Sequence, residues 1–365
     1  MLISSLGSLD RLPEITKRYG PSKVLLVTGK VSFETSGAAS VLVRHLSEKS
    51  FIRFSDFSIN PKIEEAMLGV EMARQGNIDM ILAIGGGSVL DMAKLIKAFF
   101  VKPDKASEIA EGKQPVQDPG IPLIVVPTTA GSGSEATHFA VVYKGTHKYS
   151  LASPIILPDA AILDGGLIKS NSPFQKAVNG LDALAQGIES TWAVGATEQS
   201  RELALKAVQE AVQFLPKILQ GDSDVDHQSM IQAANLAGQA INTSKTTAAH
   251  AFSYAFTSHL QTPHGQAVWL TLPAIFQRHA CSKDPALQPI MERLMALLSI
   301  EDKTKSAERL RHFTESLGIV CDMKVLGADK VHQRAFIAGQ VNQERLGNNP
   351  IAFSAQDIAE IFELA

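Results

Sequence analysis

A short apolar run followed by glycines and then by a helical pattern is the sequence feature that most restricts the fold. Residues 80–84 are apolar, residues 85–88 read GGGS, and helical spacing of apolar residues follows. The same order recurs where the run ending at Pro127 opens into the loop 128–135, TTAGSGSE. Alternating strands and helices predict a parallel sheet with helices on both faces.

Further segments extend this alternation toward the N-terminus. Residues 23–28 form a short apolar run that ends at Gly29, as a buried parallel strand does. Residues 36–49 and 63–75 have helical patterns, and residues 51–57 are compatible with a strand. The sequence therefore predicts an α/β dinucleotide-binding domain over residues 1–165.

The pattern changes after residue 165, because strand signals nearly disappear. Helical stretches are predicted over residues 173–193, 198–215, 226–243 and 354–363. We therefore expect an all-helical domain over residues 166–365. The predicted fold class is α/β plus all-α, with a parallel-sheet nucleotide-binding domain followed by a helical one that binds metal and substrate.

Charge and composition exclude several function classes. The net charge is −3 and no basic run occurs, which argues against nucleic acid as a partner. No apolar run approaches the roughly 20 residues that span a bilayer, and the N-terminus lacks a secretory pattern. Cys281 and Cys321 match no metal or redox spacing, so reduced thiols in a cytoplasmic protein are expected.

The two glycine-containing loops are candidates for binding phosphate. Glycines allow close approach of backbone N–H groups, and a helix N-terminus adds a favourable dipole. One such loop is often only a structural turn, whereas two at strand ends favour a nucleotide site. Neither loop has the GxGxxG fingerprint. The candidate cofactor residues here are Gly85, Gly86, Gly87, Ser88, Asp91, Thr128, Thr129 and Ser132.

Four polar residues between positions 178 and 265 suggest a metal site. Asp182 and Gln186 are four apart in a helical context and share a face. His250 lies in a helical pattern and His264 in a Thr-Pro-His-Gly turn. Together they suit one divalent metal, zinc or ferrous iron. The alternative is a solvated helix face with unrelated structural histidines.

The chain resembles the iron-containing, or group III, alcohol dehydrogenases. The motifs GGGSVLDMAK, PTTAGSGSEAT, GLDALAQGIES and TPHG occur in the family order across nearly the whole sequence. The resemblance implies NAD(P) binding, a metal held by Asp182, His250 and His264, hydride transfer at an alcohol or aldehyde carbon, and a homodimer or larger homo-oligomer. No protein nucleophile is needed for such a transfer, and no catalytic residue is expected beyond the metal ligands.

Two positions depart from the family pattern. Gln186 stands where a histidine ligand is usual, which leaves an amide ligand, weaker metal binding, or the metal-free state of the maleylacetate reductase branch. Tyr254 replaces an active-site histidine and becomes a candidate substrate contact. We expect that the metal is retained and bound less tightly, because an amide is a weaker donor than imidazole.

Cofactor choice is predicted at the end of the first strand. Relatives selective for NAD often have an acidic residue there, but this chain has Gly29 followed by Lys30. That arrangement tolerates a 2′-phosphate, so NADP is expected to be accepted along with NAD, and even preferred. By resemblance, Lys148 lies near the nicotinamide ribose.

A small anionic substrate is expected from Lys245, which precedes His250 and has two threonines beside it. The alternative is a solvent-facing lysine. The context SKTTAAHAFSY resembles the branch containing phosphonoacetaldehyde reductases and the enzyme that oxidises C8 of 3-deoxy-octulosonate for lipopolysaccharide biosynthesis, with a slight preference for the sugar acid. A dehydroquinate-synthase-like lyase and a non-catalytic nucleotide-binding protein remain competing hypotheses.

Overall fold

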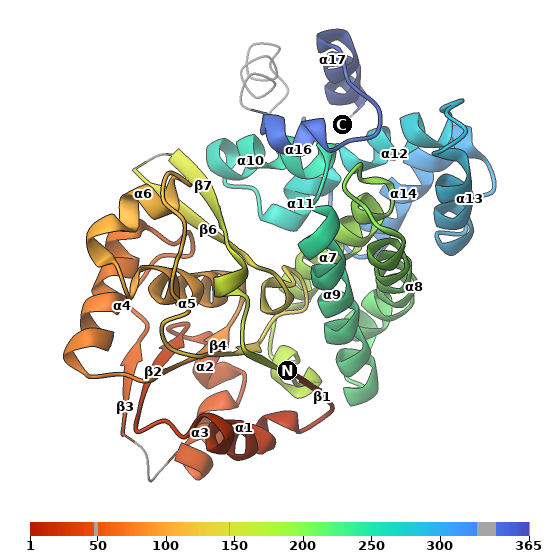
Figure 1. Ribbon diagram of the computed structural model, residues 1–365. Helices are drawn as coiled ribbons and strands as arrows, with labels where there is room; N and C mark the ends of the chain where they lie inside the picture. The colour runs from red at the N-terminus through yellow and green to blue at the C-terminus, as the bar shows by residue number, and fades with distance from the viewer. Residues whose placement is uncertain (47–49, 146, 327–340, 365) are drawn as a thin grey trace. The chain divides into compact units, whose positions relative to one another are not determined.

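The computed structural model describes residues 1–46, 50–145, 147–326 and 341–364 (Figure 1). It divides into two compact units, residues 1–171 with 222–232, and residues 172–221 with 233–365. The first unit contains the sheet and the second is helical, as the sequence predicts. The predicted boundary between a dinucleotide-binding domain and a metal-binding domain, after residue 165, stays a prediction.

Six parallel strands form the sheet of the first unit, in the order β1-β8-β5-β4-β2-β3. Their bounds are β1 Leu2–Ser4, β2 Lys23–Thr28, β3 Ser50–Phe54, β4 Met80–Gly85, β5 Leu123–Pro127 and β8 Ala160–Leu163. A separate antiparallel hairpin pairs β6 Phe139–Lys144 with β7 His147–Ala152. Neither the hairpin nor β1 and β8 was predicted from the sequence.

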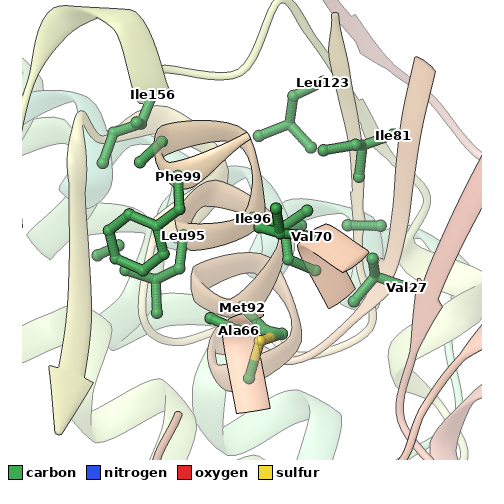
Figure 2. Packing of buried hydrophobic residues seen from close by; sticks show 14 of the residues in the cluster. Val27, Ala66, Val70, Ile81, Met92, Leu95, Ile96, Phe99, Leu123 and Ile156 are labelled. Carbon is green, nitrogen blue, oxygen red and sulfur yellow. The ribbon is translucent and has the colours of Figure 1, made fainter. Parts of the chain in front are cut away.

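Helices of this unit cover both faces of the sheet. They are α1 Leu12–Tyr19, α2 Ser32–Thr35, α3 Ala38–Leu46, α4 Ile63–Gln75, α5 Gly87–Phe99 and α6 Ala106–Ala110. Successive residues of one strand enter opposite cores, because side chains alternate across a sheet. Leu25 packs with α4 and α5, and Leu26 with α1 and α3. Figure 2 shows Ile96 of α5 beside Val70 of α4.

Residues 222–232 join the sheet unit through specific hydrogen bonds. Gln228 accepts from the backbone N–H of Gly165 and donates to the Leu163 carbonyl and the Ser4 hydroxyl. A Cβ at Gly165 would lie 2.4 Å from the Gln228 backbone nitrogen. This close approach explains why the first part of helix α9 (Asp224–Ser244) belongs to the same compact unit as the sheet, although Gly165 and Gln228 are 63 residues apart.

The second unit is built from helices that include the predicted stretches. Their bounds are α7 Pro173–Trp192, α8 Glu198–Gln220, α9 Asp224–Ser244 (shared with the first unit), α10 Ala248–Leu260, α11 His264–Trp269, α12 Leu272–Ala280, α13 Gln288–Leu297, α14 Ser306–Ser316, α16 Gln343–Gly347 and α17 Ala355–Leu364. No helix in the described ranges is both long enough and apolar enough to cross a membrane.

Helix α8 corrects one predicted boundary. The sequence prediction ended it at residue 215, before Pro216, because proline removes a helical hydrogen bond. The helix instead continues through Pro216 to Gln220. Leu215 and Ile218 are both buried, and a Cβ on Gly180 of α7 would meet Leu215 at 2.3 Å. Packing of this last turn against neighbouring helices therefore outweighs the local effect of the proline.

Candidate metal centre

Three of the predicted ligands come together in the helical unit. Asp182 lies on α7, His250 on α10, and His264 is the first residue of α11. One ligand atom from each lies within 4.8 Å of the others. The Nε2 atoms of His250 and His264 are 3.3 Å and 3.8 Å from Asp182 Oδ1. This is a convergent donor set rather than a solvated helix face.

Gly265 explains how the TPHG turn reaches α7. A Cβ at this position would lie 2.0 Å from the Val178 carbonyl oxygen and 3.2 Å from Asp182 Cβ. Trp269, at the end of the same short helix, donates a hydrogen bond of 2.7 Å from its indole nitrogen to the Leu181 carbonyl. Glycine at the start of α11 and tryptophan at its end therefore hold His264 against Asp182.

Gln186 lies on α7 one turn after Asp182 and is buried. Its side chain hydrogen-bonds the Asp182 carboxylate. Within the described part of the chain, no group donates a hydrogen bond to the buried Gln186 Oε1. A buried amide oxygen beside the donor cluster fits the predicted role of this residue as a neutral oxygen ligand.

Glu189 is a functional candidate that the sequence analysis missed. Its fully buried carboxylate accepts hydrogen bonds from His250 Nδ1, the His250 backbone N–H, the Ala249 N–H and the Thr247 hydroxyl. The Trp192 indole N–H donates to that same hydroxyl at 2.9 Å. Carboxylates commonly orient metal-binding histidines in this way. The available signal was its spacing, seven residues after Asp182 on the same helix face.

The carboxylates and imidazoles of this cluster shift one another's pKa values. Burial raises the pKa of the Asp182 carboxyl, but His264 and His250 outweigh that effect and hold the pKa below its usual value. Burial lowers the pKa of His250, whereas Glu189 and Asp182 raise it more, to about 9. Two imidazoles and a carboxylate match the donor chemistry of a divalent metal, which would displace the proton from His250 Nε2.

The two candidate substrate residues, Tyr254 and Lys245, have charged neighbours of opposite sign. The Tyr254 ring stacks on His264, with centroids 6.5 Å apart, and its hydroxyl accepts a hydrogen bond from the Arg345 guanidinium. Arg345 is buried on α16, and sequence reasoning did not single it out. The Lys245 ammonium forms an ion pair with Glu344 at 2.5 Å, so its charge already has an acidic partner.

The two candidate cofactor loops are adjacent in the sheet unit. Strands β4 and β5 pair side by side, with Gly85 opposite Pro127. A Cβ on Gly86 would meet Thr129 at 3.3 Å, and one on Gly87 would meet Ser132 at 2.8 Å. The two loops therefore lie against each other at the carboxyl ends of the strands. The other candidates are placed as expected: Ser88 in the first turn of α5 and Thr128 directly after β5.

Asp91 is part of an internal network beneath the second loop. Its carboxylate accepts hydrogen bonds from the Ser134 hydroxyl at 2.7 Å and the Val141 backbone N–H at 3.0 Å. The buried Lys94 ammonium donates to Ser134, Thr137 and the Phe139 carbonyl. Burial lowers the pKa of Lys94 to about 8. This geometry gives Asp91 a part in holding the loop. Lys148 lies on β7 and acts electrostatically on Asp91.

Gly29 and Lys30 lie directly after β2, as the sequence predicts. The Lys30 ammonium is 2.7 Å from the Asp56 carboxylate, and both side chains are exposed. The two residues are 26 positions apart, so the pairing has no local sequence signal. The cation that was expected to favour a 2′-phosphate thus has an acidic neighbour in the protein.

Comparison with known proteins agrees with this geometry. The profile described as "Iron-containing alcohol dehydrogenase" matches residues 1–165, and that described as "Fe-containing alcohol dehydrogenase family, C-terminal" matches residues 176–365. The sequence is 28% identical to long-chain-alcohol dehydrogenase 1 of Geobacillus thermodenitrificans over 98% of this chain and 93% of that one. It is 31% identical to the probable alcohol dehydrogenase EutG of Escherichia coli, covering 84% and 77%.

A similar solved structure is sulfoacetaldehyde reductase from Bifidobacterium kashiwanohense in complex with NAD+. The TM-score is 0.92 at 26% identity, and the match covers 100% of this chain and 96% of that one. The profiles span both the sheet unit with its glycine loops and the helical unit with its three converging ligands. The chain belongs to the iron-containing alcohol dehydrogenase family of oxidoreductases.

Proposed function

We propose that this protein is a metal-dependent, NAD(P)-linked dehydrogenase that interconverts a primary alcohol and an aldehyde on a small anionic substrate. The convergence of Asp182, His250 and His264, supported by Glu189, carries the proposal. Zinc and ferrous iron both suit two imidazoles and a carboxylate. Gln186 is proposed as the fourth ligand because its buried side chain lies one helical turn from Asp182 on α7.

In this proposal the glycine loops bind the cofactor, and Glu189 orients a metal ligand. The glycine loops after β4 and β5 present backbone N–H groups and hydroxyls to a dinucleotide. Glu189 holds the His250 ring so that its Nε2 faces Asp182. Asp182, His250 and His264 would hold a divalent metal that would supply Lewis-acid chemistry at a substrate oxygen, and a nicotinamide bound at the glycine loops would supply hydride-transfer chemistry.

An anionic substrate is supported by one buried arginine close to the metal ligands. Arg345 donates to Tyr254, whose ring stacks on His264, so a buried guanidinium lies one side chain away from the ligand cluster. The similar Bifidobacterium protein is a sulfoacetaldehyde reductase. Oxidation of C8 of 3-deoxy-octulosonate is the favoured substrate hypothesis from sequence resemblance. Phosphonoacetaldehyde reduction is the alternative and shares with sulfoacetaldehyde an anionic group beside the aldehyde.

A substrate screen with both cofactors tests the proposal. The protein is loaded anaerobically with Fe²⁺ or Zn²⁺, and absorbance of the reduced nicotinamide is followed with 3-deoxy-octulosonate, phosphonoacetaldehyde, sulfoacetaldehyde and neutral aldehydes of similar length. We expect turnover that depends on metal and favours an anionic member of the set. Equal or faster turnover of the neutral aldehydes would contradict the substrate class.

A histidine variant tests the metal role separately. His264→Ala is expected to reduce turnover by at least about a hundredfold while NADH and NADPH binding persist, because the altered side chain is a metal ligand and lies outside the glycine loops. His312→Ala, at an exposed position on α14, is the matched control. Turnover of His264→Ala close to that of the control would contradict a catalytic metal at this cluster.

A further inference from the structure

Arg53 is a cation held by several contacts at the carboxyl end of β2. It lies on the neighbouring edge strand β3, opposite Leu26. Its Nε donates to the Thr28 hydroxyl at 2.9 Å, and its Nη2 donates to the Gly29 carbonyl at 3.2 Å. The guanidinium also lies over the Phe33 ring, 4.7 Å from the centroid. These contacts fix the plane of the guanidinium beside the position where cofactor choice was predicted.

Residue 29 is glycine and offers no carboxylate to a ribose. The Ser32 hydroxyl oxygen lies 2.2 Å from the position that a Cβ would take there. In dinucleotide-binding folds a carboxylate near such a strand end binds the ribose 2′-hydroxyl of NAD, and a nearby arginine accommodates the 2′-phosphate of NADP. With glycine at residue 29 the first arrangement is absent there, and the Arg53 guanidinium beside Thr28 and Gly29 provides the second.

Glu34 opposes phosphate binding in the free protein. Its carboxylate is 3.0 Å from Arg53 Nη1, with 58% of the glutamate side chain exposed. Exposed ion pairs contribute only about 0–1 kcal/mol, so an incoming phosphate displaces such a carboxylate at small cost. Arg53 keeps its contacts with Thr28, Gly29 and Phe33 during this exchange. The guanidinium therefore stays in place when a phosphate replaces the Glu34 carboxylate.

We propose that Arg53 receives the 2′-phosphate of NADP and that Glu34 competes with this phosphate for the guanidinium. The inference rests on the proposed function because it requires a nicotinamide dinucleotide at the sheet unit. It assigns cofactor discrimination to a side chain of β3 in addition to Gly29 and Lys30. Changes at Arg53 and Glu34 therefore have opposite effects on NADPH and little effect on NADH.

Dissociation constants for NADPH and NADH measured by fluorescence titration at one fixed ionic strength test this assignment. The proteins compared are the wild type, Arg53→Gln, Glu34→Gln and the control Arg74→Gln, whose exposed arginine lies on α4. We expect Arg53→Gln to weaken NADPH binding about tenfold or more, because charge-assisted hydrogen bonds to the phosphate are lost. Glu34→Gln should strengthen NADPH binding about threefold, and NADH binding should stay within about twofold throughout.

The outcomes separate this inference from the proposed function. Equal loss of NADPH and NADH in Arg53→Gln would show a structural role and overturn the assignment, as would unchanged NADPH binding in both Arg53→Gln and Glu34→Gln. Thermal unfolding of each variant identifies any global loss of structure, and Glu34→Gln keeps the test decisive if Arg53→Gln unfolds. Wild-type protein that binds neither nucleotide contradicts both proposals. Selective NADPH binding without hydride transfer would contradict the proposed function but would still support Arg53 as the residue that binds the 2′-phosphate.

Discussion

Glu189 binds His250 twice, accepting hydrogen bonds from the Nδ1 atom of its ring and from its backbone N–H. The ring is thereby oriented with Nε2 directed at Asp182 Oδ1, 3.3 Å away. Thr247, whose hydroxyl receives the Trp192 indole N–H, fixes the other side of the carboxylate. The histidine ligand is therefore positioned before any metal binds.

Replacing Glu189 with Gln is expected to weaken metal binding by about 10- to 100-fold. A neutral amide orients the His250 imidazole less strongly than a carboxylate does, and it does not raise the basicity of the ring. Competition of the protein with a chelator for Zn²⁺ measures this affinity directly. Glu292→Gln, at an exposed position on α13, is the control. Unchanged zinc affinity in a folded Glu189→Gln protein would show that Glu189 does not support metal binding.

Gly265→Ala is expected to destabilise the helical unit by about 1–3 kcal/mol, since the added methyl group must displace the Val178 carbonyl. The same shift moves His264 away from Asp182, so metal affinity falls as well. Gly347→Ala provides the control, because a Cβ there meets nothing within 4 Å. Urea unfolding and metal titration of both variants are the measurements. Equal stability of the two variants would show that α11 does not need glycine here.

The sequence predicted the fold class because its main elements are locally encoded. The apolar run of β4, the glycine turn after it and the helix at residues 63–75 all appear as expected. Strand β1 has three residues, and it forms by pairing with β8, more than 150 residues away in the chain. Such a strand has no local pattern that distinguishes it from a loop. The extension of α8 past Pro216 likewise depends on packing.

The candidate site shows the same division. The helical spacing of Asp182 and Gln186 was enough to place them on one face, and the family motifs supplied His250 and His264. Partners that are distant in the sequence could not be predicted. Lys245, for example, pairs with Glu344, which is 99 residues away. Asp91 was expected at the cofactor and is hydrogen-bonded to Ser134, 43 residues away. The partners of charged residues therefore had no local signal, and the roles of Asp91 and Lys245 stay predictions.

His279 is expected to make stability depend on pH. Burial lowers its pKa from 6.5 to about 3, with Arg278 adding to the shift. Its Nε2 accepts a hydrogen bond from Asn349, and its ring meets Trp192 edge-on at 4.6 Å. The unfolded chain binds a proton below pH 6.5 and the folded protein does not, so this stability is complete above pH 6.5 and is lost as the pH falls toward 3.

His279→Phe removes the titrating group and keeps an aromatic ring in the same place. Unfolding free energies measured in urea at pH 7, 6 and 5 should therefore fall less steeply in the variant than in the wild type. The comparison is made between slopes, because the variant also changes stability at pH 7. Parallel slopes would show that His279 does not carry this proton linkage.

The contact between Gly29 and Ser32 predicts how cofactor preference can be reversed. In Gly29→Asp the new Cβ would lie 2.2 Å from the Ser32 hydroxyl oxygen, so the Ser32 side chain must rotate away, which costs little because only its terminal oxygen is too close. Adding Ser32→Ala removes that oxygen, so the double variant should accept the aspartate without any rearrangement of residue 32. Its new carboxylate can then accept from a ribose 2′-hydroxyl and repel a 2′-phosphate. NADH binding should strengthen and NADPH binding weaken in the double variant, measured against Ser32→Ala alone. If the double variant kept the wild-type ratio of NADPH to NADH affinity, the ribose would not lie at the end of β2.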